Sequence, residues 1–150
     1  VNLNKKNKKF NLTHKEMTRF NITLEEGVDF VNWCLKNNKG GEIFVPKLNS
    51  FKVIDLAKAI NQIAKFQNIG LRPGEKIHEE LISESDSLNT LEGKSHFVIL
   101  NYHTKNDIKN YKKKNKLKDL KSTLRYSSDL NKSFLSISSL RKILKINKFI

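Results

Sequence analysis

The chain has 150 residues, 37% of them hydrophobic, which is enough for one domain with a core of its own. It has no apolar run near the ~20 residues that cross a bilayer and no visible signal peptide. Its one cysteine, Cys34, excludes an internal disulfide and a zinc site of clustered cysteines. We therefore expect a soluble, cytoplasmic protein with a packed thiol and no membrane span.

The net charge of +14 suggests a nucleic-acid partner, but its distribution argues against one. Residues 40–100 carry seven basic and eight acidic side chains, whereas residues 103–125 carry nine basic and two acidic ones. The excess is almost entirely lysine, and phosphate or base recognition favours the planar fork of arginine. The sequence predicts no nucleic-acid partner, and a basic binder using residues 103–125 remains the minor alternative.

The first third of the chain predicts a strand followed by a well-specified helix. Residues 1–9 have no hydrophobic period, and we expect them to be poorly ordered and to end a preceding segment. Residues 10–13 form a candidate strand. Thr23 and Glu26 match the capping box that begins a helix, and Gly40-Gly41 ends it. Four apolar residues at helical spacing are expected to pack inward: Leu24, Val28, Val31 and Leu35.

The middle of the chain predicts short strands alternating with helices. Residues 43–45 form a strand that Pro46 closes, and Ser50 is a plausible cap for a helix whose apolar stripe runs from Val53 to Ala64. Residues 69–71 form the second strand, and residues 96–100 form the third.

The end of the chain predicts an irregular stretch and a last helix. Residues 101–121 are rich in lysine and asparagine, and we expect a mobile loop or irregular insert there. Ser136 is expected to cap a helix with Ile137, Leu140 and Leu144 aligned. The alternation indicates an α/β fold, with α+β character in isolation, and three short strands.

The turn Arg72-Pro-Gly-Glu75 is the most informative motif. Pro73 and Gly74 force a turn, and residues 75–82 are predicted to form a short helix. A guanidinium beside a helix N-terminus suits a phosphate or diphosphate, and Glu75 can accept hydrogen bonds from a sugar diol. The ordinary alternative is a surface arginine before a capped helix.

Catalytic and cofactor motifs are absent from these residues. The six glycines (27, 40, 41, 70, 74 and 93) make neither a dinucleotide-binding turn nor a P-loop. The tyrosines (102, 111 and 126) make no Tyr-x-x-x-Lys pair, and the histidines (14, 78, 96 and 103) have no metal spacing. We expect His78 to be structural. No catalytic residue and no metal site is therefore predicted.

Four segments resemble one family, in the same order. They are Met17-Thr-Arg-Phe20 with the helix after it, Gly41-Glu-Ile-Phe-Val-Pro-Lys47, Gly70-Leu-Arg-Pro-Gly-Glu75 continuing to Leu91, and Tyr126-Ser-Ser-Asp129 continuing to Arg141. Together they resemble the C-terminal part of UDP-N-acetylglucosamine 4,6-dehydratases of the inverting type. These are polysaccharide-biosynthesis members of the extended short-chain dehydrogenase/reductase family.

The resemblance implies a two-part enzyme. An N-terminal Rossmann domain, missing here, would hold NAD or NADP and the catalytic residues, so this chain alone should bind no cofactor and be inactive. Residues 10–100 would be the UDP-sugar-binding portion, residues 101–125 an insert, and residues 126–150 a tail with a terminal helix. The complete enzyme, expected to be a homo-oligomer, would oxidise C4 of the sugar, eliminate water across C5–C6 and return the hydride at C6.

The resemblance also implies roles for single residues. Arg19 and Arg72 would grip the UDP diphosphate, and Glu75 would hold the ribose hydroxyls. Lys47 and Ser50 are weaker substrate-binding candidates, the alternatives being a solvated lysine and a helix cap. A nucleotide-sugar C4 epimerase fragment and a non-catalytic UDP-binding or interaction module remain the alternative functions.

The chain departs from the family pattern at several positions, which leaves the exact sugar open. They are Asn21, Asn49, Phe51, Leu88 and Gly93.

Overall fold

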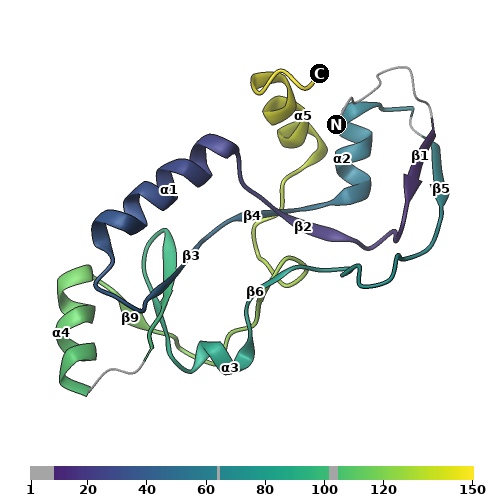
Figure 1. The fold of residues 1–150 in the computed structure, drawn as a ribbon. Helices are drawn as coiled ribbons and strands as arrows, with labels where there is room; N and C mark the ends of the chain where they lie inside the picture. Colours follow the sequence, from purple (N-terminus) through teal and green to yellow (C-terminus); the bar gives the residue numbers. More distant parts are fainter. Residues whose placement is uncertain (1–8, 64, 102–104) are drawn as a thin grey trace. The chain divides into compact units, whose positions relative to one another are not determined.

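The structure is a computed structural model that describes residues 9–63, 65–101 and 105–150 (Figure 1). It divides the chain into two compact units that are interleaved in sequence. Unit 1 comprises Val1–Asn21, Asn49–Glu79 and Ser128–Ile150, and unit 2 comprises Ile22–Leu48 and Glu80–Ser127. Among the described residues, none of the helices has the length and apolar character that crossing a membrane requires.

Unit 1 contains two strand pairs and two packed helices. Its elements are β1 (Lys9–Leu12), β2 (Thr18–Asn21), β4 (Asn49–Lys52), α2 (Val53–Ile60), β5 (Lys65–Asn68) and α5 (Ile137–Ile146). Strands β1 and β5 are parallel, and β2 and β4 are antiparallel. Helices α2 and α5 lie side by side (Figure 1), because Ala59 presents a small surface to Leu140 and Leu144 in the core.

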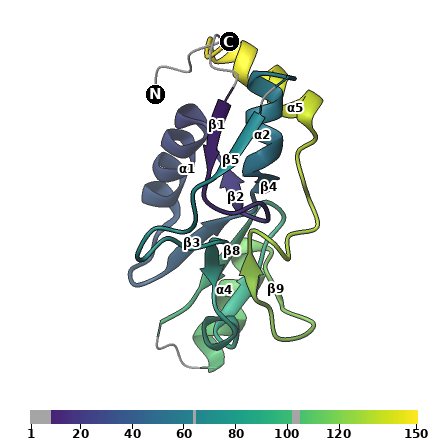
Figure 2. The same cartoon turned by 90° about the vertical axis from the view of Figure 1, so that its right-hand side faces the viewer.

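Unit 2 is built on a four-stranded sheet of order β3-β8-β7-β9. Its elements are α1 (Leu24–Asn37), β3 (Ile43–Pro46), β6 (Glu80–Ile82), α3 (Glu84–Ser87), β7 (Thr90–Glu92), β8 (His96–Ile99), α4 (Lys105–Asn115), β9 (Lys118–Asp119) and β10 (Tyr126–Ser127). Strands β6 and β10 form a separate antiparallel pair. Leu91, Val98, Leu100 and Leu117 form the core, and Figure 2 shows α4 beside the sheet.

Several local predictions are confirmed. Thr23 and Glu26 form both halves of the capping box of α1, and Gly40 and Gly41 adopt positive φ after its end. The side chain of Ser136 accepts a hydrogen bond from the Ser139 N–H at the start of α5. The strands predicted near residues 10–13, 43–45 and 96–100 are β1, β3 and β8.

The helix predicted over residues 75–82 is wrong. Residues 75–79 form no helix, and Glu80–Ile82 is strand β6. The carbonyl of Ile77, which a helix would use internally, accepts hydrogen bonds from the Thr18 N–H and from Arg19. The strand predicted at residues 69–71 is also wrong, since β5 ends at Asn68, and the described residues contain ten strands rather than three.

Two further predictions about local structure are corrected. Ser50 lies inside β4 and caps no helix; α2 begins after Lys52 without a side-chain cap and ends at Ile60, and Ala64 lies outside the described residues. The stretch expected to be irregular contains α4 and β9. Ile108 and Tyr111 anchor α4 on the core, and lysines in its last turn suit the helix dipole.

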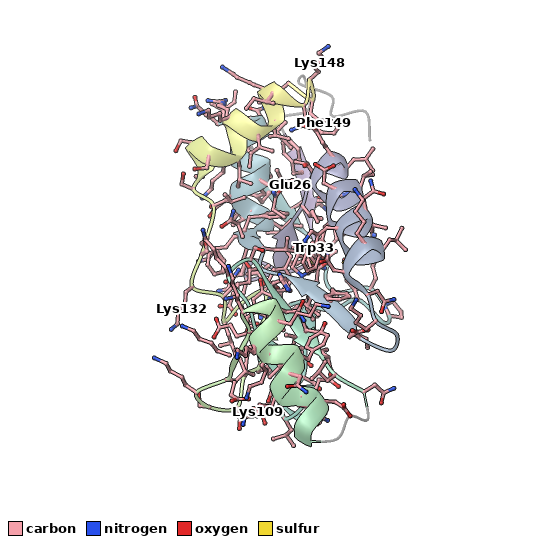
Figure 3. The ribbon with its side chains drawn as sticks, turned by 90° about the vertical axis from the view of Figure 1, so that its left-hand side faces the viewer. Glu26, Trp33, Lys109, Lys132, Lys148 and Phe149 are labelled. Carbon is pink, nitrogen blue, oxygen red and sulfur yellow. The ribbon has the colours of Figure 1, made fainter. Side chains whose placement is uncertain are left out.

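The expectation that the apolar residues of α1 pack inward is wrong for all four. Leu24, Val28, Val31 and Leu35 are exposed. The helix instead contacts the sheet through Trp33, whose ring lies 5.4 Å from that of Phe44 and 4.5 Å from that of His96 (Figure 3).

Candidate functional site

The turn at Arg72 is closed from both ends by Glu75. The Glu75 N–H donates to the Arg72 carbonyl at 3.0 Å, and the Arg72 N–H donates to Glu75 Oε2 at 3.2 Å. Gly74 adopts φ +76°, a conformation that suits glycine. The Arg72 side chain is exposed, and within the described part of the chain its guanidinium has no hydrogen bond or ion pair. The turn therefore presents a guanidinium fork to solvent.

Arg19, on β2, holds the segment that follows this turn. Its Nη1 donates to the carbonyls of Thr18 at 2.7 Å and Ile77 at 3.0 Å, and its Nη2 donates to the Lys76 carbonyl at 2.9 Å. Its Nε lies 3.6 Å from Glu79 Oε1. Three of the five guanidinium N–H donors are thus used inside the protein. Both predicted diphosphate ligands lie in unit 1, but Arg19 is largely committed to backbone carbonyls and Arg72 is not.

Glu79 fixes the far end of the same segment. Its Oε2 accepts the Phe20 N–H at 2.8 Å, which ties it to β2. Its own N–H donates to Ser128 Oγ at 2.9 Å, and its carbonyl accepts the Ser128 N–H at 2.7 Å. Residues 76–79 are therefore held on one side by β2 and on the other by Ser128.

A buried chain of polar side chains completes this support. Thr18 Oγ1 lies 2.8 Å from His78 Nδ1 and 2.6 Å from Ser128 Oγ. Thr18 and Ser128 are buried, so each depends on these partners for its hydrogen bonds. The contact with Thr18 is consistent with the structural role predicted for His78, which lies in a bend and not in a helix.

The carboxylate of Glu75 lies at the Arg72 turn. Oε2 is bonded to the Arg72 N–H, whereas within the described residues Oε1 has no hydrogen-bond partner. Glu75 is only partly buried, so a hydroxyl group can reach its carboxylate from solvent.

The two weaker candidates have partners elsewhere. Lys47, in unit 2, places Nζ 2.6 Å from Glu92 Oε1 and 4.8 Å from the centroid of the Phe97 ring. Ser50 is fully buried in unit 1, and its Oγ accepts a hydrogen bond from Asn131 Nδ2 at 3.0 Å. Ser50 thus supports strand β4 from the core, and its role as a ligand stays a prediction.

Sequence reasoning missed Glu79 and Ser128. Both lie within the quoted family segments, but they come from parts of the chain 49 residues apart, and only the fold brings them together. The described residues contain no group of three or more His, Cys, Asp or Glu side chains that could hold a metal ion, and the expectation of no metal site stays a prediction.

The titratable groups with displaced pKa values lie in unit 2. Burial, and then the charge of Lys47, lowers the pKa of His96. Burial, and then Glu42 by its charge and hydrogen bond, raises the pKa of Tyr111 to about 12. Burial also raises the pKa of the Cys34 thiol, as expected for a packed rather than a reactive cysteine.

The residues present do not fit NAD or NADP. A dinucleotide site needs a strand, a glycine-rich turn and a helix in succession. In the described chain α2 follows β4 directly, from Lys52 to Val53, and α1 follows β2 through Ile22 and Thr23, with no glycine in either connection. Neither connection therefore forms a dinucleotide-binding turn.

Comparison with known proteins places the chain in a family. The profile of the polysaccharide biosynthesis protein family matches residues 2–101. The inverting UDP-N-acetylglucosamine 4,6-dehydratase of Campylobacter jejuni is 45% identical over 92 residues, which are 61% of this chain and 28% of the relative. The UDP-glucose 4-epimerase of Rickettsia akari is 37% identical over 90 residues, or 57% of this chain and 26% of that enzyme.

A solved structure agrees with these matches. Pen from Bacillus thuringiensis superposes on 97% of this chain with a TM-score of 0.76 and 28% identity, although the match spans only 44% of Pen. The predicted mixed α/β fold, as part of a short-chain dehydrogenase/reductase domain, is confirmed. The chain spans less than a third of the curated relatives named above. It belongs to the polysaccharide biosynthesis protein family, whose members include nucleotide-sugar dehydratases.

Proposed function

We propose that this chain binds the UDP part of a nucleotide sugar, as the substrate-binding portion of an inverting UDP-N-acetylglucosamine 4,6-dehydratase. One observation carries the proposal: the Arg72 guanidinium is exposed and, among the described residues, unpaired, on a turn that Glu75 closes. The similarity to the Campylobacter jejuni dehydratase supplies the substrate class.

The chemistry of the turn suits a nucleoside diphosphate. A diphosphate carries concentrated negative charge, and Arg binds phosphate oxygens through two parallel N–H donors. Arg19 contributes its charge and its remaining donors from β2, while its other bonds hold residues 76 and 77 in place. Glu75 Oε1 would accept hydrogen bonds from the ribose hydroxyls.

The complete enzyme would use NAD or NADP, bound by polypeptide outside these residues, as its hydride acceptor and donor. The residues of this chain bind and orient the sugar nucleotide. We expect the isolated chain to be inactive, and formation of a 4-keto-6-deoxy product from UDP-N-acetylglucosamine by the purified chain would contradict this.

Epimerisation at C4 is the second candidate reaction, and the similarity to the Rickettsia akari epimerase favours it. The UDP site proposed above serves both reactions. Only the product of a complete enzyme carrying this portion distinguishes them: a 4-keto-6-deoxy sugar indicates a dehydratase, and an inverted C4 hydroxyl indicates an epimerase.

The binding proposal is tested by NMR titration of the isotope-labelled chain with uridine, UMP and UDP. We expect affinity to rise with each phosphate and amide shifts to centre on residues 72–79. Arg72→Ala should weaken UDP binding roughly 10-fold, the lower range for a charged hydrogen bond, since the site is exposed. Lys142→Ala removes one exposed charge from α5 and should leave the affinity unchanged.

Two results would contradict the proposal. The first is equal affinity for uridine and UDP, because no diphosphate recognition would then exist. The second is equal loss in Arg72→Ala and Lys142→Ala, because the effect would then reflect net charge alone.

A further inference from the structure

Helix α1 carries apolar residues on two sides. The inner side holds Phe30 and Trp33, whose rings stack at 6.0 Å, and Trp33 packs on the sheet of unit 2. The other side carries the outer stripe, which we define as Leu24, Val28, Val31 and Leu35. At about 100° per residue the stripe residues share one face, well over a quarter-turn from Trp33.

The outer stripe is far more exposed than its composition predicts. Leu24 is 86% exposed, Val28 51%, Val31 57% and Leu35 72%. If only the inner side of α1 were covered, polar residues would be expected at the outer stripe. The helix carries polar residues instead on the face between the inner side and the outer stripe: Glu25, Asp29, Asn32 and Lys36. Contiguous exposed aliphatic side chains of this kind mark an interaction surface.

The surface at the N-terminal half of the stripe is hollowed. A shallow depression of about 450 Å³ is lined by residues of this region, among them Ile22, Leu24, Gly27 and Val28. A side chain built on Gly27 would meet only Ile22 Cδ1, at 3.8 Å. The absence of a side chain at Gly27 therefore leaves room for a neighbouring element to approach the helix closely.

The size of the surface indicates the kind of occupant. The stripe spans about 16 Å of helix, since 11 residues separate Leu24 from Leu35 at about 1.5 Å each. A stable complex of separate molecules needs some 20–30 residues on each side, far more than this stripe supplies. A contact within one polypeptide needs less, because the covalent link supplies a high effective concentration.

We propose that the outer stripe of α1 packs against polypeptide of the same enzyme that lies outside these 150 residues. The relatives contain such polypeptide: the match covers 28% of the Campylobacter jejuni dehydratase and 44% of Pen. The partner surface is aliphatic, as the four leucine and valine side chains require. This inference rests on family membership and not on UDP binding, so either can fail without the other.

The test compares the isolated chain with a chimera. In the chimera, this chain replaces the aligned part of the Campylobacter jejuni dehydratase. The variant Val28→Lys/Val31→Lys is introduced into both, and Asp29→Lys, on the polar face, is the matched control. Melting temperatures are measured by circular dichroism without nucleotide, and sedimentation velocity gives the oligomeric state of the isolated chain.

We expect the double variant to melt close to wild type in the isolated chain, where both positions are exposed, and at least about 5 °C lower in the chimera. Asp29→Lys should have the same small effect in both. An equal shift of the double variant in the two settings would overturn the proposal, as would a wild-type chimera that does not fold. A wild-type dimer that the double variant dissociates would also overturn it, because the occupant would then be a second copy.

Discussion

Replacing Ser128 by alanine is the sharpest test of how the Arg72 segment is held. The Ser128 side chain is fully buried; its Oγ shares a hydrogen bond with Thr18 Oγ1 at 2.6 Å and accepts one from the Glu79 N–H at 2.9 Å. In the variant, Thr18 keeps His78 as a partner, but the Glu79 N–H loses its acceptor.

The expected loss follows from these two bonds. A half-buried donor left without an acceptor costs about 1–3 kcal/mol, and the lost bond to Thr18 adds about 0.5–1.5 kcal/mol. Together they give an expected loss of about 1.5–4.5 kcal/mol in the free energy of unfolding of Ser128→Ala. Ser122→Ala, at an exposed position, should change it by less than about 0.5 kcal/mol.

Urea unfolding followed by circular dichroism gives the global value, and hydrogen exchange gives the local one. The Glu79 amide should lose protection in Ser128→Ala more than the amides of the unit 2 sheet do. An unfolding free energy within about 0.5 kcal/mol of wild type, which is the size of the control effect, would refute the role of Ser128 as a support.

Three further predictions concern unit 2. Gly93→Val should destabilise unit 2 by about 1–3 kcal/mol, because even a Cβ at this position would lie 3.0 Å from Leu117 Cδ2. Urea unfolding followed by tryptophan fluorescence measures the loss, and an unchanged midpoint would show that the backbone shifts to accommodate the side chain. Thr23→Ala should lower the free energy of unfolding by about 1 kcal/mol, because α1 loses its N-cap, and thermal unfolding followed by circular dichroism measures this. Thr23→Ser keeps a capping hydroxyl and should stay near wild type; equal losses in the two variants would contradict the capping role. Burial and Glu42 raise the pKa of Tyr111 to about 12, above the value near 10 in the unfolded chain. The neutral Tyr111 side chain should therefore contribute its full stabilisation below about pH 10 and lose it as the pH rises to about 12. Tyr111→Phe should flatten this part of the plot of unfolding free energy against pH.

Local signals in the sequence predicted local structure well. The capping box at Thr23 and Glu26, the cap at Ser136 and the strand ending at Pro46 each depend on residues a few positions apart. The turn at Arg72 was also predictable, because Pro73 and Gly74 specify it by themselves, whereas anion binding there stays a prediction.

Predictions that depended on distant partners failed. The helical pattern after Glu75 was overridden because Arg19 and Thr18, over 50 residues earlier, take the Ile77 carbonyl. The sequence did not predict α4, because the segment is rich in lysine and only two apolar side chains, Ile108 and Tyr111, anchor it on the core. The hydrophobic period identified the outer stripe of α1 as one apolar face, but a period cannot tell whether that face packs on this chain's own core or on another surface.

The interleaving of the two units has a consequence for how the chain is made. The polypeptide passes between units at four points, after Asn21, Leu48, Glu79 and Ser127. During synthesis unit 2 gains its last segment only when residue 127 has emerged, and unit 1 waits for α5 at the end of the chain. Neither unit corresponds to a continuous gene segment, so a truncation from the C-terminus removes Ser128 and α5 from unit 1 while the residues of unit 2 remain intact.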